Sequence, residues 1–298
     1  MRQSTSTPIP GSVPTTTQRG TIATIVFLAI AFFAVLLVWH SGVIGSLLYP
    51  IRLFVTLIHE AGHGLTAILT GGRFVHFQVF PDGSGLAYTA GGSRFLIPQM
   101  GYLGAAAFGA VLLIVSNRIK NVRRVAYGVA LLVGAIAILF TANGVGVLML
   151  FVGGMISFII ASATYRMRAL FQILAIGLVV AALIIASSET ALFVGIMSAA
   201  VLALVATVFP RGVTLGLLNF LGLIVGLDVL LDIWSLMSFP GASLGYIPND
   251  AAAIAQSTGL PTQFWVLLWA VLALVMNGFA IYESFIATRR VEPVAPIV

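Results

Sequence analysis

The chain has 298 residues, of which 60% are hydrophobic and only 7% are charged. Soluble domains carry about 25% charged residues, so this composition excludes an ordinary soluble protein and predicts an integral membrane protein. The formal net charge is +6, but the Lys and Arg residues lie between apolar runs, where they orient helices in a bilayer and do not indicate nucleic-acid binding. Cysteine is absent, which excludes disulfides and thiolate metal ligands.

The N-terminal part predicts a polar tail followed by a membrane span. Residues 1–20 are rich in Ser, Thr and Pro, which is typical of a disordered tail. Residues 21–39 form an apolar run that is too long for a signal-peptide core, and no small-residue cleavage site closes it, so we expect a retained span. The next apolar run, residues 51–69, ends before Gly71 and Gly72, as helices often do.

The run at 51–69 contains His59, Glu60 and His63 in an H-E-x-x-H pattern. His59 and His63 project from one face of a helix, where two imidazoles can bind one tetrahedral Zn²⁺. Glu60 lies beside the metal position and can act as a general base towards a zinc-bound water. The alternative is two core histidines and a packing glutamate. The chain has only four His and eight acidic residues, so their concentration in five apolar-flanked positions favours a metal site.

Residues 73–90 differ from the rest of the chain because their pattern is that of β-strands. Val75, Phe77 and Val79 are expected on one face of the first strand, and an Asp-Gly turn leads to a return strand at 86–90. Lipid does not tolerate open strand edges, so we expect this hairpin to be buried in protein or to line a wet cavity beside the motif helix. The alternative is an ordinary hairpin loop outside the membrane.

Further apolar runs after the hairpin predict further membrane helices. They cover residues 96–115, 125–141, 145–163, 169–186, 191–209, 213–237 and 264–286. The predicted fold class is therefore an all-α polytopic membrane protein of about eight to nine transmembrane helices with a small membrane-associated β-hairpin. Residues 21–287 are expected to form a single transmembrane domain, and residues 288–298 a short C-terminal tail.

A catalytic zinc needs a third protein ligand and an open position for water. Without cysteine, this ligand is a carboxylate or another histidine. Asp228 and Asp232 lie one turn apart in the run 213–237, and acids within a span require a partner, which a metal would supply. Polar lining of an unrelated channel is the alternative. Asp250 is a further candidate, although an Asp here also suits the cap of a helix that begins at Ala251.

At these residues the chain resembles the site-2-protease-type intramembrane zinc metallopeptidases, and more closely the M50B-like peptidase family. The resemblance covers about residues 50–116 and 212–270. It is carried by the motif helix, the paired glycines, the hairpin, the late acidic helix and the sequence Gly101-Tyr102-Leu103-Gly104.

In site-2 proteases the third zinc ligand is an Asp in a later span, within a pattern of Asn, Pro and Asp-Gly. Here Asn219 precedes Asp228 by nine residues, but the prolines are absent and Val229 replaces the glycine. The resemblance therefore implies Asp228 as the third ligand, Asp232 as the alternative, and Asn219 as a substrate or oxyanion contact.

The resemblance implies a zinc-dependent endopeptidase that hydrolyses peptide bonds in or near the bilayer. Zinc held by His59, His63 and Asp228 would activate a water molecule, and Glu60 would accept its proton. Tyr102 is a further possible site residue. We expect the protein to lie in the cell (plasma) membrane.

The expected substrate is a membrane protein or a single-span peptide, unwound and added as a strand to the hairpin edge at Phe77, Gln78 and Val79. Two alternatives are kept. One is a catalytically silent relative that binds membrane partners, and the other is an ion or proton transporter that uses the helix with Asp228 and Asp232.

Overall fold

The computed structural model describes residues 48–164, 166–238, 243–244 and 247–287, together with the isolated helical positions 26, 30, 33 and 34. The expected tails at 1–20 and 288–298 and most of the expected span at 21–39 lie outside the described residues.

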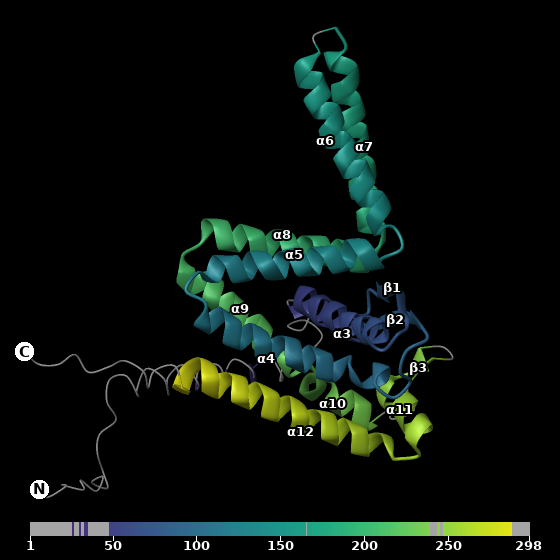
Figure 1. Ribbon diagram of the computed structural model, residues 1–298, viewed down its shortest axis with the longest axis vertical. Helices are drawn as coiled ribbons and strands as arrows, with labels where there is room; N and C mark the ends of the chain where they lie inside the picture. The colour runs from purple at the N-terminus through teal and green to yellow at the C-terminus, as the bar shows by residue number, and fades with distance from the viewer. Residues whose placement is uncertain are drawn as a thin grey trace, which may run out of the picture.

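Helices dominate the described chain, and two pairs of short strands interrupt them (Figure 1). The helices are α3 (Tyr49–Leu69), α4 (Tyr102–Arg118), α5 (Val122–Phe140), α6 (Gly144–Ala163), α7 (Arg168–Ser188), α8 (Thr190–Val208), α9 (Arg211–Gly226), α10 (Asp228–Ser238), α11 (Asp250–Thr258) and α12 (Thr262–Ile281). The 3₁₀ turn η2 (Ile97–Gln99) precedes α4, and the π-helical turn η3 (Tyr282–Ile286) follows α12. The strands are β1 (Arg73–Val79), β2 (Gly85–Ala90), β3 (Ser243–Leu244) and β4 (Ile247–Pro248).

The expectation of a mostly helical membrane protein with a small β-hairpin is confirmed, but the count of about eight to nine spans is not. Within the described residues, five helices are long and apolar enough to cross a membrane, or six if the bent pair of α9 and α10 is one span. These five are α5, α6, α7, α8 and the continuous α12–η3 segment. Helix α3 is long enough, but its Arg, Glu and two His residues reduce its hydropathy.

The apolar run at 213–237 is not one continuous helix. Helices α9 and α10 meet at Leu227 with a bend of 45°. No proline marks this break, so the apolar pattern predicted one helix where the structure has two. The bend makes Asp228 the first residue of a new helix.

Helix α4 lies between α9 and α12 and contacts both. Its contact with α9 is close because Gly109 has no side chain, and a Cβ there would stand 2.3 Å from the Gly222 carbonyl oxygen. Helices α5 and α8 pair on the far side of α3, and Figure 1 shows α6 and α7 as a pair that projects away from the other helices. Helix α3 is thus enclosed by the hairpin, α4 and α8.

The hairpin of β1 and β2 packs against α3, with Phe77 opposite Ala87 in the antiparallel register. Phe77 is 0% exposed and Val79 is 4% exposed, so both belong to the core beside α3. Val75 was predicted on the same face but is 55% exposed. The reason is an irregularity between Phe74 and His76, because a bulge of this kind turns the preceding side chains to the other face.

Candidate metal centre

Helix α3 buries both histidines of the H-E-x-x-H pattern on one face. The two rings stand 4.9 Å apart between centroids. Gly62 lies between them in the sequence and allows the segment before α4 to pass close, since a Cβ at position 62 would stand 2.1 Å from the Met100 carbonyl oxygen. This contact brings Gly101 and Tyr102 onto the histidine face of α3.

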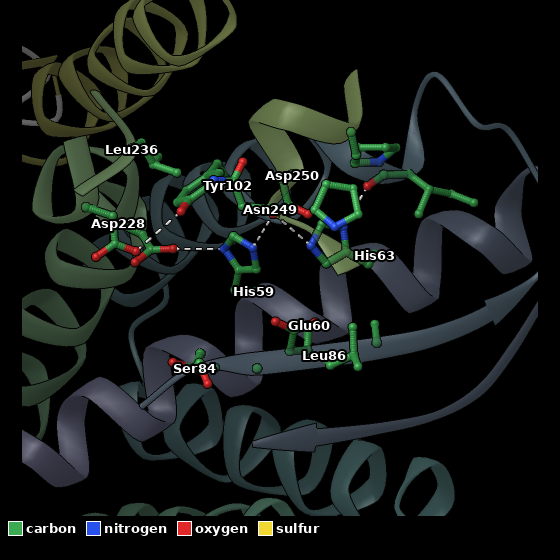
Figure 2. Close-up of a pocket in the computed structure, with 18 of the residues that line it drawn as sticks. His59, Glu60, His63, Ser84, Leu86, Tyr102, Asp228, Leu236, Asn249 and Asp250 are labelled. Atoms are coloured by element: carbon green, nitrogen blue, oxygen red, sulfur yellow. Dashed lines mark hydrogen bonds and ion pairs between the residues drawn. The ribbon is translucent and has the colours of Figure 1, made fainter. Parts of the chain in front are cut away.

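Asp250 closes the space in front of both histidines. Its Oδ2 lies 2.9 Å from His59 Nε2 and 3.1 Å from His63 Nε2, as Figure 2 shows. Burial by itself raises the pKa of Asp250, but the adjacent His63 and His59 rings outweigh it and hold the pKa well below its usual range. Asp250 therefore meets the two rings as a carboxylate anion.

Asp250 is free for this contact because its neighbour caps the helix. Asn249 occupies the N-cap of α11, and its Oδ1 accepts a hydrogen bond from the Ala252 N–H at 2.8 Å. The cap that the sequence suggested for Asp250 is thus made by Asn249. An Asn is as good an N-cap residue as an Asp, so the sequence contained both possibilities.

The opposite nitrogen of each ring is already bonded. His63 Nδ1 donates to the Ile97 carbonyl oxygen at 2.7 Å, and His59 Nδ1 contacts Asp228 Oδ2 at 3.0 Å. When the rings give up their Nε2 protons and keep a proton on Nδ1, as metal binding requires, both Nε2 atoms carry lone pairs. Two lone pairs and a carboxylate oxygen then face one another, an arrangement that a metal cation stabilises. The donor set therefore fits a metal ion.

Gly101 keeps the space before the two Nε2 atoms open. A Cβ at position 101 would stand 2.2 Å from His59 Nε2 and 2.5 Å from His63 Nε2. These distances are near the about 2.0–2.1 Å that zinc keeps from an imidazole nitrogen. A side chain at this position would therefore occupy the space that a shared ion needs. The sequence showed Gly101 only as part of the resemblance, without this role.

Glu60 lies on the hairpin side of the site. Ligand atoms of His59, Glu60 and His63 all lie within 4.8 Å of one another, and the three residues are buried. The Ala87 N–H is directed at the Glu60 carboxylate. Gly85 makes room for it, because a Cβ at position 85 would stand 2.4 Å from Glu60 Oε1.

The turn of the hairpin is bonded to α3 at two points. Tyr49 donates from its hydroxyl to the Pro81 carbonyl oxygen at 2.7 Å, and Thr56 Oγ1 donates to the Gly83 carbonyl oxygen at 2.8 Å. These bonds fix the start of β2 beside the motif helix.

The site opens into a cavity of about 620 Å³. Its wall includes the segment 83–87 of β2 and its preceding turn, Pro98, Leu236 and Ala253. Phe77, Gln78 and Val79 are not part of this wall. Strand β1 faces α3, α5 and α8, so β2 is the strand next to the site. The predicted substrate contact at Phe77, Gln78 and Val79 stays a prediction, and these residues lie on the strand farther from the cavity.

Of the two remaining predicted site residues on α9 and α10, Asp232 lies at the cavity and Asn219 does not. Asp232 lines the cavity and accepts a hydrogen bond from the Tyr102 hydroxyl at 3.3 Å, while the Tyr102 ring packs edge-on against His59 at 4.4 Å between centroids. Asn219 lies outside the cavity wall. Its Oδ1 accepts bonds from Ser116 Oγ at 3.1 Å and Asn117 Nδ2 at 2.7 Å, which join α9 to α4. The structure thus shows Asn219 in a packing contact between α9 and α4, and its role as a substrate or oxyanion contact stays a prediction.

Apolar helices of membrane-spanning length indicate an integral membrane protein, and its buried His-Glu-His cluster could hold a metal ion. Comparison with known families agrees. The profile described as Peptidase M50B-like matches residues 27–161 and 150–280, so the chain belongs to the M50B-like peptidase family. No curated protein and no solved structure matches the chain.

Replacing Gly101 by alanine is expected to prevent metal binding and to lower Tm, because the new Cβ must displace the two buried histidine rings. Gly101 has φ −60° and ψ −66°, which alanine adopts readily, so the effect comes from the Cβ against the two Nε2 atoms. Zinc content and Tm measure it. Gly128→Ala is the matched control, because a Cβ in that helix meets nothing within 4 Å. Normal zinc content in Gly101→Ala would show that the ion does not occupy this space.

Proposed function

We propose that the protein is a zinc-dependent endopeptidase that hydrolyses peptide bonds in or near the cell (plasma) membrane. The observation that carries the proposal is the convergence of His59 Nε2, His63 Nε2 and Asp250 Oδ2 beside the carboxylate of Glu60. Three protein ligands and a free position are the arrangement of catalytic zinc. We take Asp250 as the third ligand, because Asp228 lies on the opposite nitrogen of His59.

Zinc, when bound, polarises a peptide carbonyl and lowers the pKa of a water molecule. The chain's own residues supply the rest. Glu60 accepts the proton of the attacking water and passes it to the leaving nitrogen. Asp228 and the Ile97 carbonyl hold the two rings so that their Nε2 atoms face the same space. Burial of the site limits competing water.

The proposed substrate is a segment of a membrane protein or a single-span peptide, delivered from the lipid bilayer. Strand β2 pairs only with β1 among the described strands, so its other edge is available along the cavity wall. An extended substrate adds to this edge through backbone hydrogen bonds, next to Glu60. A helical peptide bond is shielded by its own backbone bonds, so the segment must unwind first.

The test is zinc content followed by cleavage. Elemental analysis of the detergent-purified full chain is expected to give about one zinc per protein, and His63→Ala is expected to lose it. In vesicles, the protein is then combined with a panel of single-span segments that each join two tagged soluble domains. Fragments identified by mass spectrometry should appear, and a chelator should suppress them.

Two results would contradict the proposal. A folded wild type without zinc would remove the metallopeptidase mechanism. Zinc binding without cleavage of any panel member would favour the silent relative that binds membrane partners. The transporter alternative is not required to explain Asp228 and Asp232, since His59 and Tyr102 already give these acids hydrogen-bond partners.

A further inference from the structure

The bend between α9 and α10 releases a backbone carbonyl that a straight helix would bond. In a continuous helix, the Leu230 N–H would donate to the Gly226 carbonyl, four residues earlier. Here it donates to the Leu227 carbonyl oxygen at 2.9 Å. The Gly226 carbonyl is buried and therefore needs another donor.

Asn277, near the C-terminal end of α12, supplies this donor. Its Nδ2 lies 2.8 Å from the Gly226 carbonyl oxygen and 3.0 Å from the Ala273 carbonyl oxygen, one turn earlier in its own helix. A glycine at position 226 leaves room for this contact, because a Cβ there would stand 2.1 Å from Asn277 Oδ1. The hydrogen bond from Asn277 to Gly226 thus holds α12 against the bend between α9 and α10. We call this bend, residues 226–228, the joint.

The hydrogen bond of Asn277 to Gly226 comes with a cost in stability. The side chain is 1% exposed, and within the described part of the chain its Oδ1 has no hydrogen-bond partner. A buried acceptor without a partner destabilises the folded state. An apolar side chain would remove that cost but would leave the Gly226 carbonyl unbonded. Asn277 therefore contributes the hydrogen bond that fixes the bend between α9 and α10.

The joint lies next to the metal centre. Asp228 is two residues beyond Gly226 and begins α10, and its Oδ2 contacts His59 Nδ1 at 3.0 Å. We propose that Asn277 is a positioning residue for the metal centre: by fixing the bend, it keeps Asp228 on His59 and thereby directs His59 Nε2 at the metal. This inference rests on the proposed zinc site. Carboxylates that orient ligand histidines in this way change metal affinity when they are lost.

Asn117 of α4 provides a matched control. Its Nδ2 also bonds the carbonyl oxygen one turn earlier, that of Leu113 at 2.8 Å, and an acceptor on α9, here the side-chain Oδ1 of Asn219 at 2.7 Å. The contact on α9 is about two helical turns before the bend. Loss of Asn117 therefore removes a similar interhelical bond without touching the joint.

The experiment compares Asn277→Ala and Asn277→Ser with Asn117→Ala in the purified full chain. Zinc affinity is measured by competition with a chelator, ligand geometry by the visible absorption of the cobalt(II)-substituted protein, and stability by Tm. The Asn277 variants are expected to bind zinc about 10- to 100-fold more weakly and to change the cobalt spectrum. Asn117→Ala is expected to keep the zinc affinity and the spectrum of the wild type.

An Asn277→Ala protein with wild-type zinc affinity and cobalt spectrum would overturn the inference, whatever its Tm. If the alanine variant does not fold, the zinc affinity and cobalt spectrum of Asn277→Ser test the inference. A serine hydroxyl still bonds the Ala273 carbonyl one turn earlier but does not extend to Gly226. A folded wild type that binds no zinc would overturn the proposed function itself. If only the inference about Asn277 is wrong, the wild type still binds zinc. The two failures can therefore be told apart.

Discussion

Glu60→Gln is expected to reduce cleavage by about 10²- to 10⁴-fold, the usual contribution of a general acid–base group, while zinc content stays at the wild-type value. Glutamine keeps the size of the side chain and its contacts with Gly85 and Ala87, but it does not accept a proton from water. The rate of fragment formation in vesicles and elemental analysis of the same sample give both quantities.

Glu189→Gln is the matched control for this change. The Glu189 carboxylate accepts hydrogen bonds from the N–H groups of Ala142 and Asn143 at 2.9 and 3.1 Å. Glu189 is not one of the residues that line the cavity. The control should lower Tm and leave cleavage unchanged. Full cleavage by Glu60→Gln would disprove the role of Glu60 as general base, and simultaneous loss of zinc would indicate that Glu60 is a metal ligand.

Asp250→Asn is expected to lose stoichiometric zinc, because it replaces the anionic ligand that faces both Nε2 atoms. Asp228→Asn is expected to retain the site with an affinity that is about 10- to 100-fold lower, since it only weakens the orientation of His59. Chelator competition on the two purified variants gives the order of the two effects.

Asp232→Asn serves as the third member of this series. Asp232 bonds Tyr102 and not a histidine nitrogen, so its replacement should have the smallest effect on zinc affinity. The reverse order, with zinc lost in Asp228→Asn and kept in Asp250→Asn, would restore the ligand set that the family resemblance implies. Loss of zinc in Asp232→Asn alone would make Asp232 the ligand.

Local patterns of the sequence were sufficient to predict most helices of the fold and its main hairpin. The spacing of His59, Glu60 and His63, the alternation in the hairpin and the length of the apolar runs depend on residues close together in the chain. Helical and strand periodicities are properties of such short segments. These features therefore predicted the motif helix, the hairpin and most later helices, and the absence of cysteine limited the possible ligands to His and carboxylates.

Only the tertiary structure decided which acid faces the histidines, which strand borders the cavity and where the late span breaks. His59 contacts Asp228 and Asp250 across 169 and 191 residues of sequence. Which of these acids meets Nε2 depends on what occupies Nδ1, on the cap made by Asn249 and on the joint held by Asn277. All three are contacts that form when helices pack, and residue spacing along the chain carries no information about them.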